Sequence, residues 1–325
     1  MRLRVCLSAL VAVSLLPVTM VAAEAQKFPT KPVRVIASSG AGGLSDVFMR
    51  ALGEELHKKW GQPIIVENRP GGHFNIGVRA CSEAEPDGYT ICIMGSTALT
   101  YNPYLFRKLP FDYKTAVVPV TNLFIITQAL GVNAKLGVKT FDQLVDYAKK
   151  NPGKLSYIAP STPQTLFMDN MNKQRGTDWV RVPFRGGGDT MGAVVAGSTP
   201  IAFLGLGNQL SFIDAKSVVP VLVDSEKRSP LLPDVQTIDE IGYDGPMTRG
   251  SFGLYAPPGT PKAIIDQIAA DVRAAASKPE FVAKNYRARA LEPVLDSPEE
   301  FARFIEKDRI AAGRVIKDAG VKPYD

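Results

Sequence analysis

Short apolar runs alternate with helix-like segments along the first part of the chain. Strands are predicted at 33–38, 64–66 and 90–94. A helix lies between the first two strands, because Val47, Leu52 and Leu56 recur near helical spacing. Either Ser45 or Asp46 can cap this helix, and Gly61 can end it.

The same alternation starts again further along the chain. It predicts a strand at 125–132, a helix at 141–150 and a strand at 155–159. A helix at 190–196, an apolar Gly-rich run at 201–207, strands at 218–223 and 252–256, and three amphipathic helices follow. Strands that alternate with helices predict two α/β lobes, each with a mainly parallel sheet flanked by helices. Because no linker separates the lobes, we expect the chain to cross between them more than once, with the ligand site between them.

Composition narrows the class of protein. The chain has 325 residues, of which 45% are hydrophobic and 22% are charged, which excludes a disordered, collagen-like or coiled-coil protein. The formal net charge of +6 is scattered along the chain without a Lys/Arg-rich run. The charge pattern therefore favours anionic partners and does not indicate nucleic acid binding.

The N-terminus reads as a secretory signal peptide. Two arginines precede an apolar stretch at 5–23, and small residues follow it before Gln26. We predict a signal peptide at 1–25, cleaved after about Ala25, and an exported protein. The alternative is an uncleaved membrane anchor.

Cysteine and histidine are scarce in the remaining chain. Cys6 leaves with the signal peptide, so only Cys81 and Cys92 remain. An export compartment permits a disulfide between them, but Cys81 is expected to end a helix and Cys92 to lie in an apolar strand, which favours two free thiols. Two cysteines and two histidines at unrelated positions make a metal site improbable, and no cofactor is predicted.

A Gly-rich loop joins the first predicted strand to its helix, where open parallel sheets bind ligands. Its backbone amides and the helix dipole favour an anion. The loop lacks the ending of a phosphate-binding P-loop and the spacing of a dinucleotide fingerprint. The alternative is a tight turn before a capped helix. The candidate ligand-binding residues are Ser39, Gly40, Ala41, Gly42, Gly43, Ser45 and Asp46.

Two further strand-to-helix loops lie in the second half. Hydroxyls and an amide in one loop can bind a carboxylate, unless they serve as an ordinary helix N-cap. Arg185 in the other can pair with an anionic ligand, unless it is a surface cation. The candidate residues are Ser161, Thr162, Gln164 and Thr165 in the first of these loops and Phe184, Arg185 and Gly186 in the second.

Catalytic chemistry has little support in the sequence. His57 lies among charged residues on an exposed helix face, and His73 follows a Gly-Gly turn. No Gly-x-Ser-x-Gly elbow and no Ser-x-x-Lys motif is present. We therefore predict no enzymatic activity and no catalytic residue, with a secreted α/β hydrolase as a remote alternative.

Several segments of the chain form a recognisable pattern when they are taken in order. They are Gly42 to Asp46, Gly61-Gln62, Val66 to Gly71, Asn75-Ile76-Gly77, Pro86 to Thr90, Asn102-Pro103, Leu109 to Asp112, Asn151 to Tyr157, Arg228-Ser229-Pro230, Leu232 to Val235 and Gly253 to Pro257. In this order they resemble the Bug-type periplasmic substrate-binding receptors of tripartite tricarboxylate transporters. The resemblance covers essentially the whole chain after the signal peptide.

The resemblance implies a two-lobe periplasmic binding protein of the Venus-flytrap type. Lobe 1 would comprise 26–126 plus 250–325, and lobe 2 would comprise 127–249. Such a receptor captures a small organic acid, acts as a monomer without a cofactor and delivers its ligand to the membrane subunits of a transporter. A ligand sensor for a membrane signalling protein is the alternative. The first two loops would hold the ligand carboxylate, partly through water, and the third would close the far side.

This chain departs from the family pattern in its loops. Ser38, Ser39 and Ala41 stand where the family usually has an aromatic residue and prolines. The second loop carries Ser161 to Gln164 in place of a Gly-x-Gly-Ser/Thr pattern, and Phe167 follows where the family has His. These departures predict a roomier pocket that is more polar on one side. Asp46 is expected to orient loop amides or a bridging water.

Overall fold

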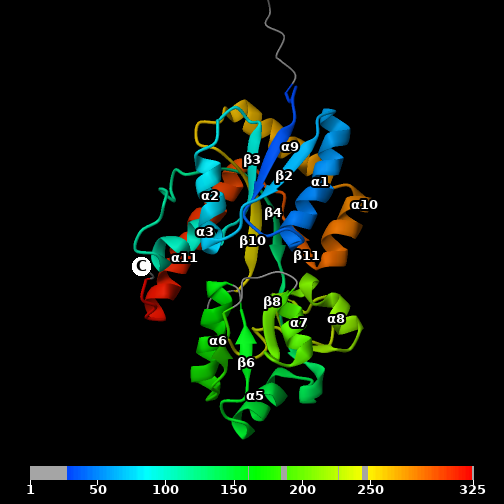
Figure 1. The fold of residues 1–325 in the computed structure, drawn as a ribbon, viewed down its shortest axis with the longest axis vertical. Coiled ribbons are helices and arrows are strands. Elements are labelled where there is room, and N and C mark those ends of the chain that lie inside the picture. The colour runs from blue at the N-terminus through cyan, green and yellow to red at the C-terminus, as the bar shows by residue number, and fades with distance from the viewer. Residues whose placement is uncertain (1–27, 160, 184–188, 226, 244–247, 324–325) are drawn as a thin grey trace, which may run out of the picture.

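The computed structural model describes residues 28–323 except 160, 184–188, 226 and 244–247. The predicted signal peptide lies outside these residues. In Figure 1 the N-terminal and C-terminal elements share one end of the long axis, and the central elements occupy the other. Within the described part of the chain, no helix is both long and apolar enough to cross a membrane.

The first sheet has six strands in the order β11-β4-β10-β3-β1-β2. β1 is parallel to β2 and β3, whereas β10 is antiparallel to both β3 and β4, and β11 is antiparallel to β4. The strands are β1 (Val33–Ala37), β2 (Ile64–Asn68), β3 (Thr90–Gly95), β4 (Val118–Ile126), β10 (Gly250–Ala256) and β11 (Leu291–Pro293).

Helices cover both faces of this sheet because successive strand residues point to opposite sides. Val35 packs with α1 and α9 on one face, and Ile36 packs with α2, α3 and α11 on the other. The segments are α1 (Leu44–Trp60), η1 (Gly72–Phe74), α2 (Asn75–Ser82), α3 (Thr97–Thr100), α4 (Asn102–Leu105), α9 (Lys262–Ala276), α10 (Pro279–Phe281), η4 (Val282–Tyr286), η5 (Arg287–Arg289) and α11 (Pro298–Asp318).

The second sheet has five strands in the order β7-β6-β8-β5-β9. β6 is parallel to β7 and β8, and β5 is antiparallel to β8 and β9. The elements are β5 (Gln128–Asn133), η2 (Ala134–Leu136), α5 (Phe141–Lys150), β6 (Ser156–Ile158), α6 (Thr162–Arg175), β7 (Val180–Arg181), α7 (Asp189–Ala196), β8 (Ile201–Gly205), η3 (Leu206–Asn208), α8 (Leu210–Asp214) and β9 (Val218–Asp224).

Two sequence-based expectations need correction. The single strand predicted at 125–132 is two strands, because β4 ends at Ile126 in the first sheet and β5 begins at Gln128 in the second. The sheets are also mixed and not mainly parallel. The chain returns to the first sheet through β10, which runs antiparallel to both of its neighbours, β3 and β4. In the second sheet β5 likewise runs antiparallel to both of its neighbours, β8 and β9.

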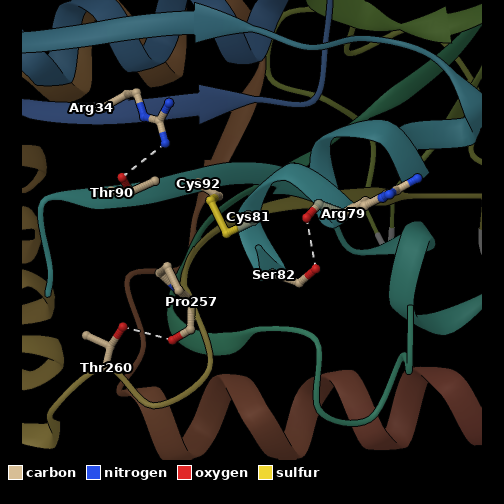
Figure 2. The surroundings of a disulfide bond; sticks show 8 residues. All are labelled: Arg34, Arg79, Cys81, Ser82, Thr90, Cys92, Pro257 and Thr260. Carbon is tan, nitrogen blue, oxygen red and sulfur yellow. Dashed lines mark hydrogen bonds between the residues drawn. A yellow bond between two sulfur atoms is a disulfide. The ribbon is translucent and has the colours of Figure 1, made fainter. Parts of the chain in front are cut away.

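A disulfide joins Cys81 of α2 to Cys92 of β3, as Figure 2 shows. The sequence favoured two free thiols, and this preference was wrong. The end of α2 packs on β3 within the core, where both cysteines are fully buried, and their Cα atoms are 6.2 Å apart. That separation lies in the range that a disulfide spans.

Candidate functional site

The first loop is an exposed turn above a buried polar base. Gly40, Ala41 and Gly42 are exposed between β1 and α1, whereas Ser45 and Asp46 are buried. Gly42 has a φ of 78°, a left-handed conformation that glycine adopts without strain. The expected cap is wrong: Gly43 is the N-cap of α1, so Ser45 and Asp46 lie in the first helical turn.

Asp46 gathers three hydrogen-bond donors around one buried carboxylate. It accepts from the backbone N–H of Gly42 at 2.9 Å, from Asn68 Nδ2 at 2.9 Å and from Arg50 Nε at 3.1 Å. Burial works to raise the pKa of the Asp46 carboxyl, but the hydrogen bonds from Arg50, Gly42 and Asn68 outweigh it and hold that pKa below its usual value. The carboxylate therefore stays charged and fixes the turn to α1.

Asn68, the last residue of β2, extends this network to the start of the loop. Its Nδ2 also donates to the carbonyl oxygen of Ser39 at 3.0 Å, and its Oδ1 accepts from Arg50 Nη2 at 3.1 Å. The hydroxyls of Ser39 and Ser45 are hydrogen-bonded at 2.5 Å. The shape of the first loop is thus set by protein contacts before any ligand arrives.

The second loop begins α6 with Ser161 as its N-cap. The N–H and the hydroxyl of Ser161 donate to Gln164 Oε1 at 3.1 and 2.8 Å, and the hydroxyl of Thr165 donates to the carbonyl oxygen of Ser161 at 3.2 Å. Gln164 is buried and donates through Nε2 to Gln128 Oε1 of β5 at 2.6 Å. Gln164 therefore holds the loop on the sheet, while Ser161, Thr162 and Thr165 remain partly exposed.

The third group of candidates, Phe184, Arg185 and Gly186, lies outside the described residues. Arg181 at the end of β7, shortly before them, is described and exposed. Outside the gaps of the described chain, no three His, Cys, Asp or Glu side chains gather closely enough to hold a metal ion.

Residues beside the two loops bring elements of the two sheets into direct contact. The side chain of Leu44, the first residue of α1, lies against Gly205 and Gly207. A Cβ atom added to either glycine would lie 3.3 Å from a methyl carbon of Leu44. Leu166 of α6 packs with residues of the helices around the first sheet. These positions were not predicted from the sequence, although the Gly-Leu-Gly at the end of β8 was a visible signal of close approach.

Gly207→Ala is expected to disturb this junction. A Cβ atom at Gly207 would lie 2.2 Å from the carbonyl oxygen of Arg289 in η5, so η3 and η5 must separate. We expect the free energy of unfolding to fall by about 1–2 kcal/mol, measured by urea denaturation, and the radius of gyration to rise in X-ray scattering. Gly192→Ala on α7, where nothing lies within 4 Å, is the control. Equal behaviour of the two variants would contradict this role.

Most of the chain matches a known protein family. The model of the tripartite tricarboxylate transporter family receptor matches residues 48–321. The chain belongs to this receptor family. The matched residues begin within α1, so the first loop lies just before them. The family is one of periplasmic solute-binding receptors, as the sequence predicted.

Curated relatives and solved structures agree with this membership. A UPF0065 protein of Bordetella pertussis is 30% identical over 303 residues, which are 93% of each chain. The solved structure "R. palustris Rpa4515 with adipate" is 26% identical, has a TM-score of 0.85 and covers 91% of this chain and 100% of its own. The periplasmic binding protein BugD, 24% identical with a TM-score of 0.83, covers 91% of this chain and 100% of its own and shares the fold. The predicted binding-protein fold is therefore confirmed.

Proposed function

We propose that this receptor captures a small carboxylate-bearing molecule between its two lobes and delivers it to the membrane subunits of a tripartite transporter. The observation that carries the proposal is the first loop. An exposed glycine turn stands at the carboxyl end of β1 and at the N-terminus of the 17-residue helix α1, where backbone N–H groups and the helix dipole favour an anion. A relative, Rpa4515, has been solved with adipate.

The ligand-contacting residues are divided between the lobes. In lobe 1 we assign contact to the turn of Ser39 and Gly40–Gly43, and we assign Ser45 and Asp46 to its support. In lobe 2 we assign contact to Ser161, Thr162 and Thr165, with Gln164 as their support. Phe184, Arg185 and Gly186 remain candidates for the far side of the ligand. The proposed lobes are 26–126 with 250–325 and 127–249, because the strands of the two sheets divide at these positions.

Ligand capture follows from contact with both lobes. A carboxylate that touched one loop alone would bind the open and closed forms equally and would not shift the equilibrium between them. A ligand that reaches the first loop and the second loop together binds the closed form more tightly and so drives closure. The receptor works in this proposal as a monomer in the periplasm, after cleavage near Ala25, and carries out no chemical reaction.

Native mass spectrometry of the freshly purified mature protein tests the proposal, followed by a thermal-shift screen of organic acids. A carboxylate present at 100 times its dissociation constant should stabilise the protein by about 2.7 kcal/mol. A released mass that matches an organic acid would support the receptor function. Stabilisation by sugars or amines with none by any carboxylate would contradict it.

A further inference from the structure

The helix α11, red in Figure 1, has an apolar inner side and a basic outer side. Phe301, Ile305 and Ala312 are buried at helical spacing and pack into the core around the first sheet. Ile310 lies on the opposite side of the helix and is 48% exposed. It borders a surface depression of about 440 Å³. The residues that line this depression all belong to α11 and are Arg303, Glu306, Lys307, Ile310, Ala311 and Arg314.

The end of α4 and the loop after it pack beside this helix. A Cβ atom added to Gly313 would lie 2.7 Å from a ring carbon of Tyr104, so the tyrosine ring lies directly on α11. The guanidinium of Arg309 lies over the ring of Tyr113, 5.2 Å from its centroid. These contacts join the loop and the helix into one surface. We call this surface the basic face, and it comprises residues 104–114 and 302–317.

The basic face holds the charge excess of the chain that follows the predicted signal peptide. It contains eight Lys or Arg residues and three Asp or Glu residues, a net charge of +5. Residues 26–325 contain 36 Lys or Arg and 31 Asp or Glu, which is also +5, so the rest of that chain is neutral. The charge is scattered in the sequence, but the fold gathers it. The basic residues are Arg107, Lys108, Lys114, Arg303, Lys307, Arg309, Arg314 and Lys317.

This combination of groups favours an acidic protein segment as the partner. A concentrated positive charge attracts an anionic surface and speeds its association. The guanidinium groups of Arg303 and Arg314 can each hold a carboxylate through two parallel hydrogen bonds. Ile310 adds an apolar contact within the charged surroundings, as the centres of protein interfaces have.

Two other occupants fit the basic face less well. A second copy of the chain would bring two surfaces of charge +5 together if the face paired with itself, and like charges repel. An anionic membrane binds a basic helix firmly when the apolar side of that helix inserts among the lipids. The apolar side of α11 is already packed in the core, so the helix cannot insert in this way.

The inner side of α11 also touches the second lobe. Leu166 of α6, the helix that begins at the second loop, packs with Ala312 and Ile316. A partner on the outer side of α11 would therefore dock beside a junction between the lobes. That position suits a partner that receives the ligand when the lobes separate.

We propose that the basic face docks an acidic segment of a membrane subunit of the transporter. The inference rests on the proposed function and deepens it, because it assigns the surface through which the receptor meets the membrane. Ligand capture and docking then use different residues, since the basic face contains none of the candidate ligand-binding residues. A substitution on the basic face should therefore impair transport without impairing ligand binding.

Uptake measurements test this separation. One variant combines Arg303→Glu, Lys307→Glu and Arg314→Glu and so reverses three charges on the outer side of α11. In cells of the native host that lack the wild-type gene, this variant should reduce uptake of the acid found in the ligand screen at least about tenfold. The same acid should raise the melting temperature of the variant as much as that of the wild-type protein. This second measurement also shows that the variant is folded.

The matched control reverses three exposed lysines at the end of α5 and just after it. It combines Lys149→Glu, Lys150→Glu and Lys154→Glu and should keep wild-type uptake. Wild-type uptake by the α11 variant, or an equal loss in the control, would overturn this inference and leave the proposed function standing.

A photocrosslinker identifies the partner. Benzoylphenylalanine in place of Ile310, irradiated with native membranes, should become joined to a membrane subunit of the transporter at a peptide rich in Asp and Glu, identified by mass spectrometry. A crosslink to phospholipid or to a second receptor, or none at all, would overturn the inference. If no carboxylate binds the wild-type protein, the proposed function fails, and the crosslink at Ile310 still decides whether the basic face docks that subunit.

Discussion

Replacing both Cys81 and Cys92 by alanine is expected to lower the free energy of unfolding by about 3 kcal/mol. The two cysteines are separated by 11 positions in the sequence, and their bond restricts the unfolded chain over that loop. Both side chains are also fully buried, so their loss removes packing from the core on one face of the first sheet. Urea denaturation under non-reducing conditions measures the change.

A reducing agent supplies the control for this result. It should destabilise the wild-type protein nearly as much as the double substitution does, and it should leave the double variant unchanged. A double variant that loses less than about 1 kcal/mol would show that the disulfide restricts the unfolded chain little.

Asp46→Ala is expected to weaken carboxylate binding at least about tenfold, which corresponds to about 1.4 kcal/mol of binding free energy. The substitution removes the acceptor that holds Gly42, Asn68 and Arg50, so the exposed turn loses its fixed shape. The free energy of unfolding should also fall by about 2 kcal/mol, because buried donors lose their partner. Calorimetry with the acid found in the ligand screen and urea denaturation measure the two effects.

Asp142→Ala is the matched control, since Asp142 is an exposed acidic residue in the first turn of α5. It removes a favourable charge from a helix N-terminus without touching a candidate loop.

Acid titration tests the direction in which the stability contributed by Asp46 depends on pH. Because the pKa of Asp46 is lowered in the folded protein, its stabilisation is complete above the unfolded pKa near 4 and is lost as pH falls through the folded value. Unchanged affinity in Asp46→Ala would contradict the supporting role.

The sequence predicts elements well where local signals bound them. The helix at 141–150 has the predicted bounds because Thr140 caps its start and Asn151-Pro152-Gly153 stops it. The division between β4 and β5 left no such signal. Only Thr127 and Gln128 interrupt the apolar run. Which sheet each half joins is decided by pairing with β10 or with β8.

The candidate site also has features that the sequence could predict and features that it could not. A strand, a glycine cluster and a helix in succession located the first loop from the sequence. The partners of Asp46 were out of reach, because Asn68 is 22 positions away and meets it only through the pairing of β1 with β2. The left-handed backbone of His73 was equally hidden, since a single histidine after Gly71-Gly72 does not specify its own backbone angles.

The position of β10 has a consequence for how the protein folds. β10 lies between β3 and β4, although 123 residues separate the end of β4 at Ile126 from its first residue, Gly250. Until that strand has been synthesised, β3 and β4 are two unjoined edges, and closing so long a loop slows folding. The first sheet can therefore become continuous only late in synthesis. Until then the growing chain cannot complete the fold of its N-terminal part.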